Sequence, residues 1–311
     1  MDGELTAGPG AAPPAPPGRA GLPGLPEPPQ LGTAALPPGT YAGRCVLVTG
    51  GGTGLGKAIA AEFARLGADL VVISRSSQHL AAARSALEPL GGGVHTVVAD
   101  IRDAEQVAAA FGAAEAAFGL PDVLVNNAAA NFPSPAEDLS ANAWRTVVDI
   151  TLNGTFVCTR EFGRRHLAAR TPGSVVCIGA SYSWTGGPGF AHSAAAKAGV
   201  KSMVESLAVE WAPYGISVNA LVPGLFPHED MTADIRASLD RSPDTAARQP
   251  ALRTGRVQEL GWAATFLASP YARFISGHTL VVDGASWLRR DLTQPPVVPV
   301  REQLGRPPFA G

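Results

Sequence analysis

The chain has 311 residues, of which 46% are hydrophobic and 16% charged, a composition typical of a globular protein. Its net charge of −2 gives no electrostatic reason to bind nucleic acid or an acidic membrane, and no stretch reaches the roughly 18 apolar residues of a membrane-spanning helix. These properties make a small molecule the expected partner.

The two ends of the chain differ in composition from the rest. Residues 1–40 are rich in Pro, Gly and Ala, so we predict a disordered tail there and a second Pro-rich tail over 291–311. Between the two tails we predict a single domain over residues 41–290. The start of the chain lacks a basic segment followed by an apolar run, and three cysteines are a poor disulfide framework, so we predict a cytoplasmic protein.

Short apolar runs alternate with longer helical patterns between the tails. Continuous apolar strands separated by helices indicate a parallel sheet that is covered on both faces. We therefore predict an α/β fold, a Rossmann-type, doubly wound seven-stranded parallel sheet in a single domain, with ligands at the carboxyl ends of its strands. The predicted strands are 45–49, 70–74, 94–99, 123–126, 174–179, 217–221 and 279–282.

A glycine-rich loop, TGGGTGLG over residues 49–56, follows the first strand and opens a helix. Glycine lets the backbone approach a pyrophosphate, and a helix N-terminus offers unpaired N–H groups and a positive dipole end. An ordinary glycine-rich turn is the alternative interpretation. The residues predicted to hold the phosphates of a dinucleotide are Gly50, Thr53, Gly54, Leu55 and Gly56.

The spacing of this loop resembles TGxxxGxG, the pattern of the short-chain dehydrogenase/reductase family, and further motifs similar to those of the family follow in order over residues 41–287. The segment NNAA at 126–129 resembles the family's NNAG, an acidic residue follows the third strand, and Pro-Gly follows the sixth. The resemblance implies a nicotinamide dinucleotide and these additional contacts with it: Asp100, Ile101, Asn127, Ala128, Pro223, Gly224, Leu225 and Phe226.

The end of the second strand bears on the choice between NAD and NADP. An NAD enzyme usually has a carboxylate there against the ribose 2′-hydroxyl, but this sequence has Ser74 and Arg75. A guanidinium can bind a 2′-phosphate in a bidentate pair. We therefore predict NADPH, whereas a solvated surface arginine would leave the preference open.

The catalytic motif departs from the pattern of most short-chain reductases, which carry YxxxK, a serine 13 residues before the tyrosine and an asparagine on the preceding helix. Aligned through Lys197, the tyrosine position is Ser193, the serine position is Ala180 and the asparagine position is Thr151. An ordinary carbonyl reduction would lack its proton donor. The protein is either a pseudoenzyme or an enzyme whose donor comes from elsewhere.

Tyr182 favours the second interpretation. It lies 15 residues before Lys197, just past the fifth strand, and Tyr182, Ser193 and Lys197 at this spacing resemble the mitochondrial-type 2,4-dienoyl-CoA reductases. The stretch NNAAANF at 126–132 is similar to NNAAGNF of that subfamily, with Ala130 in place of a glycine.

The subfamily resemblance implies a role for each residue. Tyr182 and Asn131 would donate hydrogen bonds to the thioester oxygen, Lys197 would hold the nicotinamide ribose, and Ser193 would support them. An aromatic side chain packed beside Trp184 is the alternative for Tyr182, and a loop-forming role is the alternative for Asn131.

These features predict an NADPH-dependent reductase of a conjugated acyl thioester, most closely a 2,4-dienoyl-CoA reductase, with no metal site. Alternatives are a 2-enoyl or 3-oxoacyl thioester reductase, another short-chain oxidoreductase or, in a different class, a non-catalytic NADPH-binding sensor or subunit. The irregular stretch 226–253 is predicted to be a substrate lid. The resemblance alone implies a homo-oligomer, a tetramer, assembled through helices at 141–170 and 193–211.

Overall fold

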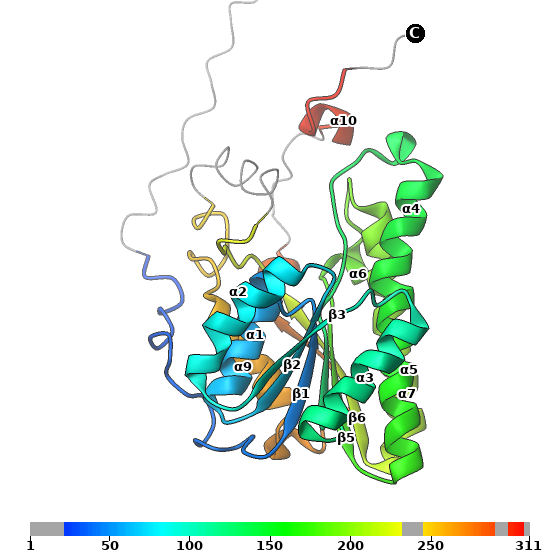
Figure 1. Ribbon diagram of the computed structural model, residues 1–311. Coiled ribbons are helices and arrows are strands. Elements are labelled where there is room, and N and C mark those ends of the chain that lie inside the picture. Colours follow the sequence, from blue (N-terminus) through cyan, green and yellow to red (C-terminus); the bar gives the residue numbers. More distant parts are fainter. Residues whose placement is uncertain (1–21, 232–244, 290–297, 308–311) are drawn as a thin grey trace, which may run out of the picture.

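The computed structural model describes residues 22–231, 245–289 and 298–307 of the chain. These residues form one seven-stranded sheet of order β3-β2-β1-β4-β5-β6-β7, in which every neighbouring pair is parallel (Figure 1). The predicted doubly wound parallel sheet is confirmed. Its strands are β1 (Cys45–Thr49), β2 (Asp69–Ser74), β3 (Val94–Val98), β4 (Val123–Asn126), β5 (Gly173–Ile178), β6 (Ile216–Pro223) and β7 (Thr279–Val282).

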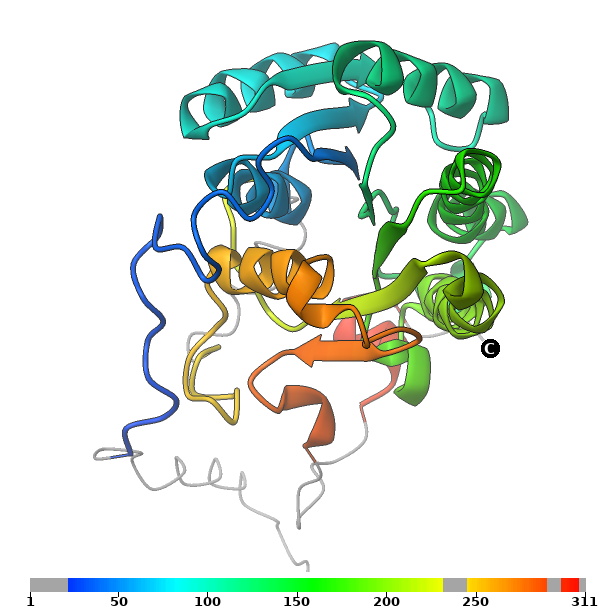
Figure 2. The same cartoon turned by 90° about the horizontal axis from the view of Figure 1, so that it is seen from below.

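Helices cover both faces of the sheet, as the view from below shows (Figure 2). One face carries α1 (Gly54–Arg65), α2 (Ser77–Leu87) and α9 (Val257–Leu267). The other carries α3 (Ala104–Phe118), α5 (Gly154–Ala169) and α7 (Ala191–Trp211), and α4 (Ala141–Val148) leads into α5 through a π-helical turn, Asp149–Asn153. Two short α-helices, α6 (Tyr182–Thr185) and α10 (Val300–Gln303), and several 3-10 turns are also present.

Side chains of each strand alternate between two hydrophobic cores. Val46 and Val48 of β1 share a core with Phe63 of α1, whereas Leu47 shares the opposite core with Phe111 of α3, and all five are fully buried. Burial on both faces makes the strands continuous apolar runs. For this reason the sequence predicted the bounds of β1, β4 and β7 correctly and those of the other strands within one or two residues.

The described part of the predicted N-terminal tail, residues 22–40, lies along α9. Arg256 pairs with Glu27 at 3.0 Å, and Trp262 Nε1 donates a hydrogen bond to the backbone oxygen of Thr33 at 3.1 Å. This part of the tail therefore makes specific contacts with the domain. The remainder of the tail lies outside the described residues.

The described part of the C-terminal tail, residues 298–307, contains α10 and lies at the same end of the domain as α6 (Figure 1). Arg301 pairs with Glu137 at 3.3 Å and with Asp138 at 2.8 Å, in the loop after β4. This tail is thereby joined to the loop that also carries Asn131.

The predicted lid, 226–253, is described only at its two ends, because residues 232–244 lie outside the described part of the chain. Its first end returns towards α1, where it contacts the glycine-rich loop. No helix among the described residues is long and apolar enough to span a membrane.

Candidate active site

The loop between β1 and α1 has the geometry of a phosphate cradle. Gly50 and Gly54 have φ angles of 63° and 54°, in the left-handed region that favours glycine. A Cβ atom at Gly56 would lie 2.4 Å from Asn127 Nδ2 and 2.5 Å from the oxygen of Gly50, so a side chain does not fit there. Thr53 precedes α1 without a side-chain capping bond, which leaves the amides of the first turn for another partner.

A cavity of about 500 Å³ opens against this loop, at the carboxyl ends of the central strands. Most of the residues predicted to bind the cofactor line it: Gly50, Thr53, Gly54, Leu55, Ser74, Arg75, Asp100, Ile101, Asn127, Ala128 and Lys197. It is also lined by residues that the sequence did not assign to the site, among them Ile73, Ile150, Ile178 and, from the predicted lid, His228. The isoleucines carry no motif and could have been found only from their position at the ends of strands and helices.

Asn127 fastens the glycine-rich loop to the end of β4. Its side-chain nitrogen donates to the backbone oxygens of Thr49 and Gly50, both at 3.1 Å. In return, Thr49 Oγ1 accepts hydrogen bonds from the backbone nitrogens of Asn127 and Ala128 at 3.1 Å. These bonds fix the two walls of the cavity relative to each other.

The segment that ends β6 and follows it does not line this cavity, although we expected Pro223, Gly224, Leu225 and Phe226 to contact the cofactor. Phe226 is 5% exposed and belongs to the core shared with α1 and α9. Gly224 lies so close to Asp283 that a Cβ atom would be 2.5 Å from its side chain. The apolar side chain of Phe226 therefore packs inward.

The end of the cavity next to β2 and β3 is lined by a positive and a negative side chain, Arg75 and Asp100. Asp100 accepts hydrogen bonds from the guanidinium of Arg102, which hold the pKa of this carboxyl group below its usual range. Arg75 is exposed at the rim and makes no hydrogen bond or ion pair within the described residues. Its positive charge helps to lower the pKa of Asp100, and its guanidinium is accessible to an anionic group.

Side chains from three elements meet at the hydroxyl of Tyr182. It lies 3.0 Å from Ser193 Oγ and accepts a hydrogen bond from Asn131 Nδ2 at 3.3 Å. Tyr182 begins α6, Ser193 lies near the start of α7, and Asn131 is in the loop after β4 and lines the cavity. Burial raises the pKa of Tyr182, although the bond to Ser193 opposes the shift, so the phenol is protonated and can donate at neutral pH.

Lys197 lies one turn further along α7 and is 6% exposed. Its Nζ donates a hydrogen bond to the backbone oxygen of Ile178 at the end of β5. Burial lowers the pKa of Lys197 to about 8, an effect that Cys177 opposes. The side chain is therefore mostly protonated at pH 7 and sits at the cavity wall.

Thr151 stands at the position where most short-chain reductases have asparagine. It lies in the π-helical turn, and its hydroxyl accepts a hydrogen bond from the backbone nitrogen of Ala130 at 3.2 Å and donates to its oxygen at 3.4 Å. Ala130 is not among the described residues with a positive φ. Alanine therefore replaces the glycine of the similar motif without backbone strain, and Thr151 fixes the loop next to Asn131.

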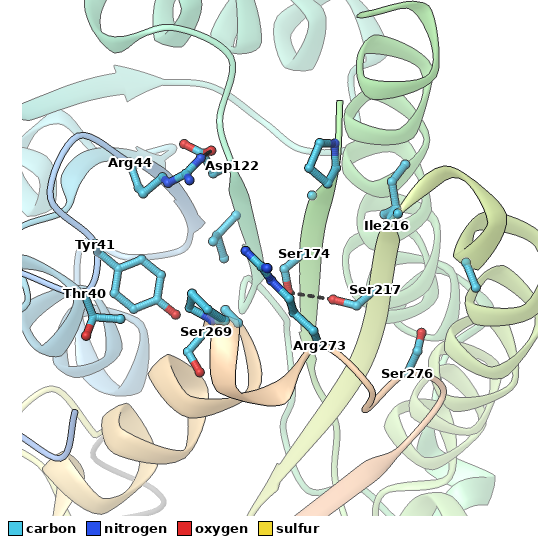
Figure 3. Close-up of a pocket in the computed structure, with 17 residues that line it drawn as sticks. Thr40, Tyr41, Arg44, Asp122, Ser174, Ile216, Ser217, Ser269, Arg273 and Ser276 are labelled. Carbon is cyan, nitrogen blue, oxygen red and sulfur yellow. Dashed lines mark hydrogen bonds and ion pairs between the residues drawn. The ribbon is translucent and has the colours of Figure 1, made fainter. Parts of the chain in front are cut away.

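A second cavity, of about 470 Å³, lies at the opposite edge of the sheet, where the strands begin (Figure 3). Arg44 pairs with Asp122 there at 2.7 Å, and Ser217 Oγ donates to Ser174 Oγ at 3.0 Å. None of the predicted site residues lines it. The candidate active site is therefore the cavity at the carboxyl edge.

Known proteins are similar to this chain in fold and in sequence. A crystal structure of a short chain dehydrogenase from Bacillus anthracis has a TM-score of 0.74 and 38% identity, and the match covers 80% of this chain and 98% of that chain. Residues 50–285 match the family model described as enoyl-(acyl carrier protein) reductase. The chain belongs to the short-chain dehydrogenase/reductase family. It is an oxidoreductase, and the family implies a nicotinamide cofactor.

Two relatives have more specific names. A probable 2,4-dienoyl-CoA reductase of Bacillus subtilis is 37% identical over 246 residues, which cover 79% of this chain and 97% of the relative. A peroxisomal 2,4-dienoyl-CoA reductase of Mus musculus is 38% identical over 250 residues, which cover 79% and 84%. The chain is thus similar to dienoyl-CoA reductases through most of the domain.

Proposed function

We propose that this protein is an NADPH-dependent reductase of a conjugated acyl thioester and that a 2,4-dienoyl-CoA is its substrate. The observation that carries the proposal is the hydrogen-bonded set of Tyr182, Ser193 and Asn131 beside a cavity that Lys197 lines. The two relatives named as dienoyl-CoA reductases support the same substrate class.

The residues around the cavity fit a nicotinamide dinucleotide. Gly56 leaves room for the backbone to approach a pyrophosphate, and the positive end of α1 favours its charge. Lys197 would hold the hydroxyls of the nicotinamide ribose. Arg75 supports NADPH over NADH, because its guanidinium is exposed at the rim and can bind a 2′-phosphate in a bidentate pair.

When bound, the nicotinamide supplies a hydride to the far end of the conjugated system. Negative charge then develops on the thioester oxygen, and Tyr182 and Asn131 donate hydrogen bonds to it. Tyr182 can donate because its phenol is protonated at neutral pH. Ser193 holds the phenol in position, and Tyr182 or an ordered water supplies the proton to carbon.

A panel of thioesters tests the substrate class. The full chain is mixed with NADPH and, in parallel, with a 2,4-dienoyl-CoA, a 2-enoyl-CoA or a 3-oxoacyl-CoA, and absorbance of cofactor and substrate is followed. We expect turnover of the dienoyl-CoA above the other two. Turnover of only the other thioesters would show that the enzyme acts on a different thioester from the one proposed. NADPH binding without turnover of any of them would favour a non-catalytic sensor.

We also propose a homotetramer and a cytoplasmic location. Phe156 on α5 and Val209 on α7 are 48% and 79% exposed, on the two helices expected to pair between subunits. Light scattering of the full chain should give four subunits, and a monomer at micromolar concentration would contradict the assembly.

The three cysteines are buried and free, which suits the reducing compartment of the proposed cytoplasmic location. Fluorescence microscopy of a tagged chain tests this location.

A further inference from the structure

The first described end of the lid contacts the phosphate cradle. Asp230 Oδ2 accepts a hydrogen bond from the backbone nitrogen of Gly54 at 2.7 Å, although the two residues are 176 positions apart. Gly54 is the first residue of α1, and Thr53 before it provides no capping bond. The first turn of α1 holds no acidic residue either, so within the described part of the chain the carboxylate of Asp230 supplies the anion at this helix N-terminus.

Lys57 joins the same contact from the first turn of α1. Its Nζ lies 3.0 Å from Asp230 Oδ2 and 2.9 Å from Glu229 Oε1. Burial acts to raise the pKa of Asp230, but the bonds from Gly54 and Lys57 outweigh it and hold this pKa below its usual value. Asp230 is therefore ionised at neutral pH. The Gly54 amide and the Lys57 ammonium group that bind it could bind another anion in the same way.

His228 brings this segment to the cavity itself. Its ring lies against Gly54, where a Cβ atom would be 3.0 Å from Cε1, and it lines the candidate cofactor site. The segment from His228 to Asp230 therefore reaches the cavity through His228 and the first amide of α1 through Asp230.

A carboxylate and a pyrophosphate cannot both occupy this place. The amide of Gly54 can serve one acceptor at the close distance seen here, and two anions so near each other repel. We propose that Asp230 occupies the pyrophosphate place in the cofactor-free chain, that the cofactor displaces it, and that Lys57 then pairs with the pyrophosphate. Asp230 and Lys57 thereby set the affinity for the cofactor.

This inference rests on the nicotinamide cofactor of the family and not on the dienoyl-CoA substrate. The apparent affinity of a ligand is its affinity for the open site multiplied by the fraction of chains whose site is open. A carboxylate bound to an amide and an ammonium group can hold about nine chains in ten closed, which would weaken cofactor binding about tenfold.

The test is a fluorescence titration of NADPH into the full-length chain and its variants. Asp230→Asn keeps the shape of the side chain and removes its charge, and we expect it to bind NADPH about tenfold more tightly. Glu229→Gln is the control, because Glu229 also pairs with Lys57 but its side chain is 80% exposed, and the hydrogen bond from Gly54 goes to Asp230. It should change the dissociation constant by no more than about twofold.

Lys57→Ala tests the second half of the proposal. It should weaken NADPH binding about tenfold in the Asp230→Asn background, because the lysine then contacts the phosphate directly. The loss should be smaller in the wild type, where removal of Lys57 also loosens Asp230. Inorganic pyrophosphate should compete with NADPH more strongly in Asp230→Asn than in the wild type. Thermal melting of each variant checks that its fold is intact.

Two results would overturn the proposal: Asp230→Asn binding NADPH no more tightly than Glu229→Gln, or Lys57→Ala losing no affinity in the Asp230→Asn background. Because the measurement is binding, a chain that binds NADPH but reduces no dienoyl-CoA would refute the proposed substrate and leave this test unaffected.

Discussion

Replacement of Gly56 by alanine tests the phosphate cradle directly. The new Cβ atom would lie 2.4 Å from Asn127 Nδ2 and 2.5 Å from the oxygen of Gly50, far inside normal contact. Either Asn127 swings away and gives up its bonds to Thr49 and Gly50, or the loop moves out of the cradle. Overpacking of this kind costs about 1–3 kcal/mol, which corresponds to roughly 5- to 150-fold weaker cofactor binding.

The assay is a titration of NADPH followed by its fluorescence, with thermal melting of the same samples. Gly112→Ala is the matched control, because Gly112 lies within α3 and a Cβ atom there has no neighbour within 4 Å. The control should bind NADPH normally and gain about 0.5–1 kcal/mol of stability from its better helix propensity. A dissociation constant of Gly56→Ala for NADPH within twofold of the wild-type value would contradict this account of the cradle.

Three further predictions concern the cavity. Arg75→Ala should weaken NADPH binding at least about tenfold and leave NADH binding within about twofold, because only NADPH has the 2′-phosphate; equal losses in the two titrations would contradict this. Burial lowers the pKa of Lys197 to about 8. Its positive charge is present below that pH and lost above it, so NADPH binding should weaken as pH rises from about 7 to 9 in the wild type but not in Lys197→Met. Asn131→Ala should lower kcat about a hundredfold and Ser193→Ala only about tenfold, since Asn131 would contact the thioester oxygen and Ser193 acts through Tyr182; similar losses in steady-state assays would reverse that order.

The sequence predicted the sheet well because burial on both faces leaves a simple mark, a continuous apolar run. It also named Tyr182, Ser193 and Asn131 as site residues, and the fold brings them within hydrogen-bonding distance, while their catalytic roles stay a prediction. The subfamily resemblance indicated that these side chains from separate elements belong to one site. Composition and periodicity alone do not indicate this.

Other contacts left no mark in the sequence. Phe226 follows a cofactor motif, but its side chain packs into the core, a direction that depends on backbone torsions beyond the strand. The bond between Asp230 and Gly54 joins segments 176 positions apart, and any acidic residue of the lid could have made it. Thr33 contacts Trp262 through a backbone oxygen, a group that every residue carries.

The central claim is that Tyr182 stabilises the oxygen of a conjugated thioester, and Tyr182→Phe tests it most directly. The change removes one hydroxyl, and Tyr214→Phe, an exposed site, is the control. With NADPH and a 2,4-dienoyl-CoA, we expect kcat of Tyr182→Phe to fall about a hundredfold to a thousandfold, while the dissociation constant of NADPH stays within about twofold of the wild type. An unchanged kcat would contradict the claim.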